Sequence, residues 1–142
     1  MKTQTTISGI THDDLVNLLS TAHYGSDWLA LEYIAKYAAY ETFEDGLAEQ
    51  LLSGASIKVC DYNAEDKNDF YGNLPHKWDN ENECMCYIVT LHDIENGIAK
   101  AIDNGGFENE CAQNLIHEPE NLDVYEAEAL MQMVVFGELI YG

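Results

Sequence analysis

The sequence predicts an α+β fold: a helix-rich single domain, residues 1–142, with a small antiparallel sheet. Two observations lead to this prediction. Several segments carry apolar residues at helical spacing, and each of these segments is preceded by a Thr or Asp that can cap the first turn of a helix. Two short segments, near 56–62 and 84–91, are rich in residues that favour strands. Because no internal repeat or change in composition divides the chain, we expect one domain.

The first predicted helix follows Thr11. Thr11 and Asp14 have the spacing of a capping box. Leucines and an alanine follow at helical spacing as far as Ala22, and the polar residues 23–26 end the helix. The next segment, 27–39, is ambiguous. Its first half alternates as a strand would, but the alanines at 35, 38 and 39 favour a helix.

Four further helices are predicted. Thr42 and Asp45 begin one, and Gly54 stands where its C-terminal cap belongs. Thr90 and Asp93 begin another, which Gly105 and Gly106 end, and a short helix at 107–117 follows. Asp123 precedes the last helix, whose single apolar face should lie in the core while Glu126 and Glu128 point away.

Between the two predicted strands, which we expect to pair antiparallel, lies a polar and acidic insertion at about 63–83. It is long for a structureless loop, and loops of this length are commonly functional. It also contains Phe70, Tyr71 and Trp78, and with Tyr62 these could anchor a partner. For Phe70 and Trp78, we consider packing of the insertion onto the domain the better explanation.

The charge of the chain is its strongest functional signal. Twenty-six acidic residues face six lysines and no arginine, giving a formal net charge of −20, and no basic residue follows Lys100. A charge this negative disfavours direct binding to nucleic acid or to anionic membranes, and it suits a basic protein surface. The absence of arginine also argues against a neutralising network of salt bridges. Solubility alone would be the other explanation of the charge.

Two acidic clusters are candidate binding sites for such a partner. One lies in the insertion and the other in the lysine-free C-terminal stretch. Together the candidate partner-binding residues are Asp61, Glu65, Asp66, Asp69, Tyr71, Asp79, Glu81, Glu83, Glu118, Glu120, Asp123, Glu126 and Glu128. A compact chain of this length is about 35 to 40 Å across, and duplex DNA of that length carries roughly 20 phosphates. The totals match, so the two clusters would resemble DNA if they converged on one face.

The sequence signals for a metal site are weaker than the charge signal. Cys84 and Cys86 would share one face of a strand, Cys60 could approach them, and His76 or His92 could complete a zinc site, but buried structural thiols explain the pattern better. The segment after Asp61 lacks the glycine and the final glutamate of a calcium loop. We therefore expect neither a metal nor another cofactor.

No catalytic motif is present. The sequence contains no nucleophile elbow, no phosphate loop and no paired metalloprotease histidines. We expect no enzymatic activity. The chain also has no charged leader followed by an apolar block, and no apolar run long enough to span a membrane, so we expect a soluble, cytoplasmic protein.

Four segments, at 23–28, 61–66, 69–78 and 136–142, resemble small acidic proteins of phages and mobile elements of gut Firmicutes. The resemblance implies an accessory gene, and such genes often encode inhibitors of host defence, including anti-CRISPR and antirestriction proteins. It supplies no catalytic residues.

The resulting hypothesis is an anti-defence protein in the bacterial host cell. It would bind a nucleic-acid-handling host protein, most specifically a CRISPR effector nuclease, by presenting a DNA-like acidic face. The alternative is a small structural or regulatory module that assembles with itself through the insertion and mimics no DNA.

Overall fold

The computed structural model describes residues 8–34 and 42–142. Within these ranges the chain forms five α-helices, one short 3-10 helix and a four-stranded antiparallel sheet. The elements are α1 (His12–Gly25), β1 (Leu29–Tyr33), α2 (Phe43–Leu52), β2 (Ile57–Asp61), β3 (His76–Asp79), β4 (Cys84–Val89), α3 (Leu91–Asn104), α4 (Gly106–His117), η1 (Pro119–Asn121) and α5 (Val124–Val135). The predicted α+β fold is confirmed.

The sheet has the strand order β1-β2-β4-β3, so β2 and β4 lie in the middle and β1 and β3 form its edges. All three pairings are antiparallel, and Val59 of β2 lies opposite Leu31 of β1 and Tyr87 of β4. The two strands expected from the sequence are therefore the central pair, and their antiparallel pairing is confirmed.

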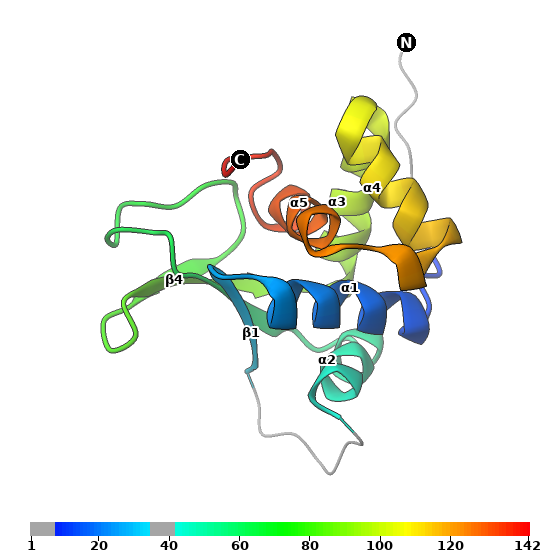
Figure 1. Ribbon diagram of the computed structural model, residues 1–142. Coiled ribbons are helices and arrows are strands. Elements are labelled where there is room, and N and C mark those ends of the chain that lie inside the picture. Colours follow the sequence, from blue (N-terminus) through cyan, green and yellow to red (C-terminus); the bar gives the residue numbers. More distant parts are fainter. Residues whose placement is uncertain (1–7, 35–41) are drawn as a thin grey trace.

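The helices lie on one side of this sheet (Figure 1). Because side chains alternate along a strand, β2 and β4 send Ile57, Val59, Met85, Tyr87 and Val89 into the helical core. The intervening side chains point to the opposite face, where buried cysteines form a second, separate cluster. The sheet thus has two faces of different character.

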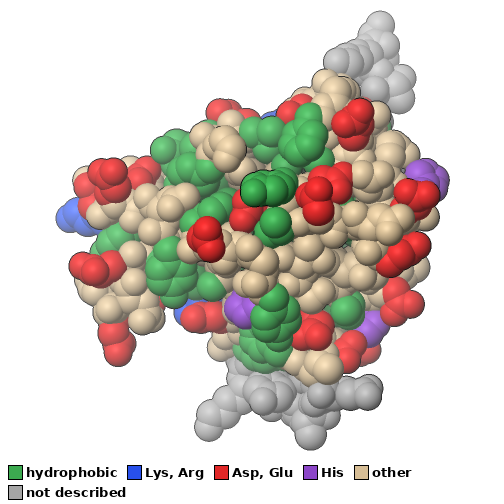
Figure 2. All heavy atoms as spheres, in the orientation of Figure 1, with side chains coloured by type: hydrophobic (Ala, Val, Ile, Leu, Met, Phe, Trp, Pro, Cys, Tyr) green, Lys and Arg blue, Asp and Glu red, His purple; other side chains and the backbone are tan. Residues whose placement is uncertain are grey.

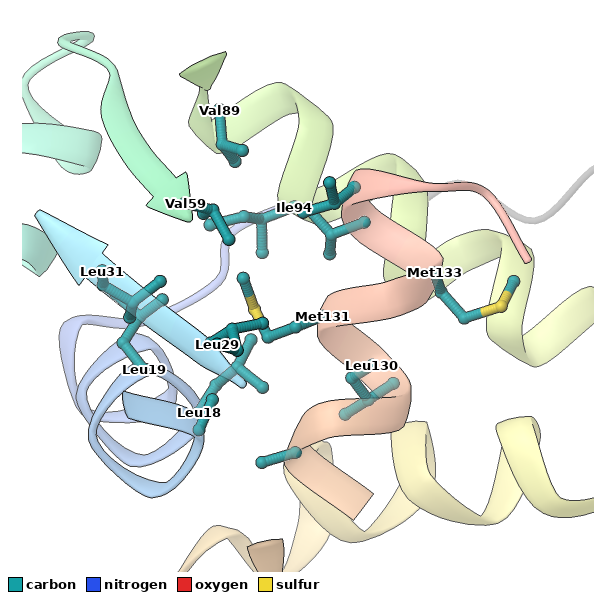
Figure 3. Close-up of a cluster of buried hydrophobic side chains, with 14 of the residues drawn as sticks. Leu18, Leu19, Leu29, Leu31, Val59, Val89, Ile94, Leu130, Met131 and Met133 are labelled. Carbon is teal, nitrogen blue, oxygen red and sulfur yellow. The ribbon is translucent and has the colours of Figure 1, made fainter. Parts of the chain in front are cut away.

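The main core is centred on α5. Figure 3 shows Met131 of α5 lying among Leu18 of α1, Leu29 of β1 and Ile94 of α3. From Ala129 to Val135 every residue of α5 is buried, so this part of the helix is enclosed on all sides rather than on one apolar face. The central position predicted for it is confirmed.

The crossing of α3 and α5 depends on a glycine. A Cβ atom at Gly97 would lie 2.5 Å from the Cα of Val134 and 2.7 Å from its backbone nitrogen. No side chain fits between backbones this close, and glycine lets the two helices approach each other.

The capping signals were accurate. Thr11, Thr42, Thr90 and Asp123 each accept a hydrogen bond from the backbone N–H three residues later, as an N-cap does. At the end of α2, Gly54 has a φ of 94°, the left-handed conformation that its predicted capping position requires. Gly105 ends α3, but Gly106 begins α4, so only the first of the two predicted terminators acts as one.

The helical interpretation of 27–39 is wrong where the structure describes this segment. Residues Leu29–Tyr33 form an edge strand, in which Leu29 and Leu31 are buried and the other three residues are half-buried. The alanines at 35, 38 and 39 lie outside the described residues. Pairing with β2 and burial of alternate leucines decide the state of this segment, and both depend on contacts distant in sequence.

The insertion at 63–83 is not entirely a loop, because it contains the edge strand β3. The first part of the insertion leaves the sheet and then packs against the C-terminal end of α5 (Figure 1). At Gly72, where φ is 76°, a Cβ atom would lie 2.8 Å from the carbonyl oxygen of Val135. The insertion therefore packs on the domain.

Candidate functional site

The acidic side chains of the insertion shape its backbone. The Asp66 carboxylate accepts a hydrogen bond from the Asn68 N–H at 2.8 Å, and Asp69 accepts one from the Glu65 N–H at 2.9 Å. Asp79 accepts hydrogen bonds from the Asn82 side-chain amide and from the backbone N–H groups of Glu81 and Asn82. The bond from the Asn82 side chain, followed by those from the backbone, lowers the pKa of Asp79. Some carboxylates chosen as contact residues thus also fix the conformation of the loop.

Asp61 is not available to a partner, which corrects its selection as a contact residue. It is only 1% exposed, and its carboxylate accepts hydrogen bonds from the Tyr141 hydroxyl at 2.7 Å and from the Asn63 N–H at 2.9 Å. Burial raises its pKa despite these bonds. The strand alternation that buries Val59 also turns Asp61 inward, a signal that was present in the sequence.

Tyr71 also has a packing role. Its ring meets the edge of Phe136 with centroids 5.5 Å apart, and its N–H donates to the Tyr87 hydroxyl at 3.2 Å. It is half-buried against the core, so it holds the insertion in place. Trp78 is likewise partly buried against the core, as expected, whereas Phe70 stacks on His76 and remains 44% exposed.

The remaining insertion carboxylates face solvent to different degrees. Glu65, Asp66, Glu81 and Glu83 are exposed, while Asp69 and Asp79 are half-buried. Glu83 has a φ of 53° at the turn before β4. This turn projects away from the helices, whereas the loop that follows β2 first projects outward and then packs against the C-terminal end of α5 (Figure 1).

In the C-terminal cluster, Glu118, Glu120 and Asp123 are exposed, and Glu126 and Glu128 are half-buried. Asp123 and Glu126 form the capping box of α5, and the Glu126 carboxylate also accepts a hydrogen bond from the Asn114 side chain. The sequence pattern predicted that Glu126 points away from the domain. In the structure it is half-buried and bonded to Asn114 instead.

The two clusters do not merge into one dense patch. In the orientation of Figure 1 the insertion lies at one end of the molecule, and α4 with the turn before α5 lies at the other. Figure 2 shows acidic side chains over both ends of this face and between them, interrupted by apolar and uncharged surface. The condition set for a DNA-like density, convergence of the two clusters on one face, is therefore not met, and this counts against a continuous DNA-like patch.

The lysines do not neutralise these clusters. Within the described ranges, none of the carboxylates of either cluster forms an ion pair with a lysine, whereas Lys58 pairs with Glu32 of β1 at 2.9 Å. The exposed carboxylates of the two clusters, among them Glu65, Glu81 and Glu118, are therefore not neutralised by a lysine ion pair within these ranges.

The opposite face of the sheet carries the cysteine cluster. The Sγ atoms of Cys60 and Cys86 are 3.4 Å apart and those of Cys84 and Cys86 are 3.7 Å apart. All three thiols are buried, and burial raises the pKa of Cys60 and raises that of Cys84 to about 11. The approach that the sequence suggested is thus present, without His76 or His92 in the group.

A hollow of about 580 Å³ lies beside this cluster. Its lining combines polar and apolar side chains, among them Lys58, Lys77, Trp78, Cys86 and Ile88. The sequence analysis did not single out this hollow. The alternation of β4 places Cys86 and Ile88 on one face, but the register with β3 is needed to add Lys77.

Comparisons with known proteins give no relative: no family model matches the chain, and no curated protein or solved structure is significantly similar to it. None of the helices in the described ranges has the length and apolar character that a membrane crossing requires.

Proposed function

We propose that this protein binds a basic surface of a nucleic-acid-handling protein in a bacterial host and competes there with nucleic acid. One observation carries the proposal: the exposed carboxylates of the two acidic clusters form no ion pair with a lysine within the described part of the chain. Carboxylates left in this state repel one another, and a cationic surface relieves the repulsion.

The magnitude of the charge supports a polyanionic mimic over a protein with one small anionic site. A net charge of −20 is close to the roughly 20 phosphates of DNA over one molecular diameter. The carboxylates extend across the visible face rather than gathering in one pocket (Figure 2). Such a distribution suits an extended cationic surface better than a single small cationic site.

The resemblance of four segments to small acidic proteins of phages and mobile elements supports the choice of partner. An accessory gene of this kind points to a host defence protein, and a CRISPR effector nuclease is the specific target that we propose. The role is stoichiometric binding, and we propose no catalytic step.

The contact surface that we propose is smaller than the sequence suggested. It comprises the exposed carboxylates Glu65, Asp66, Glu81 and Glu83 of the insertion, with Glu118, Glu120 and Asp123 at the other end. Long-range attraction from these groups would speed the encounter, and their contribution to affinity would fall as salt is added.

A competition experiment tests the proposal. A CRISPR effector nuclease with its guide RNA, and two restriction endonucleases, are assayed for binding and cleavage of a labelled DNA duplex at low and high salt. We expect the protein to inhibit at least one of these enzymes at low salt, with inhibition weakening as NaCl increases. Failure to inhibit any enzyme at low salt would contradict the proposal.

Two charge-matched variants test the contact surface. The first carries Glu65→Gln, Asp66→Asn, Glu81→Gln and Glu83→Gln in the insertion. The second removes four exposed carboxylates elsewhere, through Asp27→Asn, Glu49→Gln, Glu110→Gln and Glu138→Gln. We expect the insertion variant to lose at least tenfold more inhibition than the second. Equal losses would mean that net charge acts without a defined surface, and a stable homo-oligomer in light scattering that buries the insertion would favour self-assembly.

A further inference from the structure

The three cysteines on the face of the sheet opposite the helices occupy positions that the strand register fixes. Cys60 of β2 lies directly opposite Cys86 of β4, and Cys84 lies two residues before Cys86 on the same face. Their Sγ atoms all lie within 4.8 Å of one another. Two rigid strands in the middle of the sheet therefore hold a triangle of thiols.

This triangle is not part of the hydrophobic core. The helical core forms one cluster, and the three cysteines form another, against which Ala30 of β1 is the only partly buried apolar residue that packs within residues 8–34 and 42–142. Cys60 and Cys84 are at most 1% exposed, and Cys86 is 6% exposed and borders the hollow lined by Lys58 and Lys77. A purely packing role does not require three thiols at one point.

The spacing of the sulfur atoms fits a bound metal. Zinc–thiolate bonds of about 2.3 Å in a tetrahedral arrangement place neighbouring sulfur atoms about 3.8 Å apart. The two shorter Sγ distances are 3.4 and 3.7 Å. We propose that Cys60, Cys84 and Cys86 bind one thiophilic metal ion, Zn²⁺ or Cu⁺, through three thiolates.

The protein supplies three ligands in the described ranges, because no His, Asp or Glu joins the cysteines there. Cu⁺ accepts thiolate ligands alone. Zn²⁺ takes a fourth ligand, and a small donor could reach it from the hollow that Cys86 borders. The Tyr62 hydroxyl, which interacts with Cys84, lies at the edge of the site.

The charge around the site is compatible with a thiolate complex. Three thiolates leave a net negative charge with either metal ion, and Lys58 interacts electrostatically with both Cys60 and Cys86 from the same face of the sheet. A disulfide between Cys60 and Cys86 would use two of the thiols and leave Cys84 without a function.

A metal titration of the full chain tests the proposal. Reduced, metal-free protein is titrated with Zn²⁺ and, separately and without oxygen, with Cu⁺. Bound metal is counted by elemental analysis after gel filtration, and metal–thiolate bonds are followed by their ultraviolet charge-transfer absorption. We expect one equivalent of one of these ions, and competition between the two ions identifies which. A wild-type chain that retains neither ion at one equivalent would overturn the proposal.

Two variants provide the matched comparison. Cys86→Ala removes a proposed ligand, and Cys111→Ala removes an equally buried thiol in α4, outside the triangle. We expect Cys86→Ala to weaken binding at least tenfold and Cys111→Ala to leave it unchanged. Equal binding by the two variants, or a Cys60–Cys86 disulfide in freshly purified protein, would overturn the proposal. If Cys86→Ala does not fold by circular dichroism, the melting temperature of the wild type decides, because a bound ion must raise it.

Discussion

At the scale of single residues, several polar side chains of this protein are partly buried and hydrogen-bonded to a neighbouring element. His23, in the last turn of α1, is an example. Its Nδ1 atom accepts a hydrogen bond from the Leu31 N–H at 3.0 Å, and its ring lies beside Phe43. Burial lowers its pKa from the ordinary value of 6.5, although Glu44 and Glu32 oppose the shift. The neutral imidazole is the form that joins α1 to β1.

We predict that His23 makes stability depend on pH. Below about pH 6.5 the unfolded chain binds a proton at His23 more readily than the folded chain does, so the contribution of His23 to stability falls as pH decreases. His23→Asn keeps an acceptor near the Nδ1 position but does not titrate. Urea unfolding of both proteins at pH 7.5 and 5.5 measures the difference. We expect the wild type to lose stability relative to the variant at pH 5.5, and an unchanged difference would contradict this.

Residue-scale features of the candidate site were predictable only in part. Alternation along a strand was enough to place Cys84 and Cys86 on one face, and it should also have placed Asp61 inside. The approach of Cys60 requires the register of β2 and β4, and the packing role of Tyr71 requires Phe136, which is far away in the sequence. Local patterns do not specify such pairs.

At the scale of elements, the helices were more predictable than the edge strands. The caps at Thr11, Thr42, Thr90 and Asp123 are local, because the capping side chain and the N–H group that it accepts from are three residues apart. In contrast, β1 and β3 owe their state to pairing with β2 and β4. Edge strands have one partner and weaker patterns, so their neighbours decide their conformation.

The crossing of α3 and α5 gives a prediction at this scale. Gly97→Ala should destabilise the protein by about 1 to 3 kcal/mol, because the added methyl group meets the backbone of Val134. The same change at an open helical position would stabilise the helix by up to about 1 kcal/mol. Denaturant unfolding measures the sign.

Asn96→Ala, at the neighbouring exposed position of α3, is the control. We expect it to change stability little, since it adds no atom to the helix crossing. If Gly97→Ala proved neutral or stabilising, the close approach of the two helices would be wrong.

At the scale of the whole molecule, charge opposes folding. Twenty-six carboxylates and six lysines occupy one domain, and the two acidic clusters form no ion pairs with lysine in the described part of the chain. The core compensates through the buried second half of α5 and a sheet covered by helices on one face. Stability should therefore respond to anything that screens or removes carboxylates.

We predict that NaCl raises the melting temperature. Charges are screened over about 8 Å at physiological ionic strength and over shorter distances as salt increases. The variant with four insertion carboxylates neutralised should melt higher than wild type at low salt and gain less from added salt. Scanning calorimetry from about 20 mM to about 500 mM NaCl measures both effects, because the distance over which charges are screened changes strongly across this range. A melting temperature independent of salt would mean that the carboxylates are already too far apart to repel.

The long-range bond between Asp61 and Tyr141 bears on how the chain folds. The two residues are 80 positions apart, and Gln132 of α5 accepts hydrogen bonds from the N–H groups of Ile140 and Tyr141, which hold that segment beside it. Because α5 fills the space between α1 and α3, a growing chain that still lacks α5 would expose their apolar faces. The sheet can pair early, through antiparallel neighbours, but closure of the core must wait for the last helix described here. Folding during synthesis should therefore end in one late cooperative step rather than proceed steadily from the N-terminus.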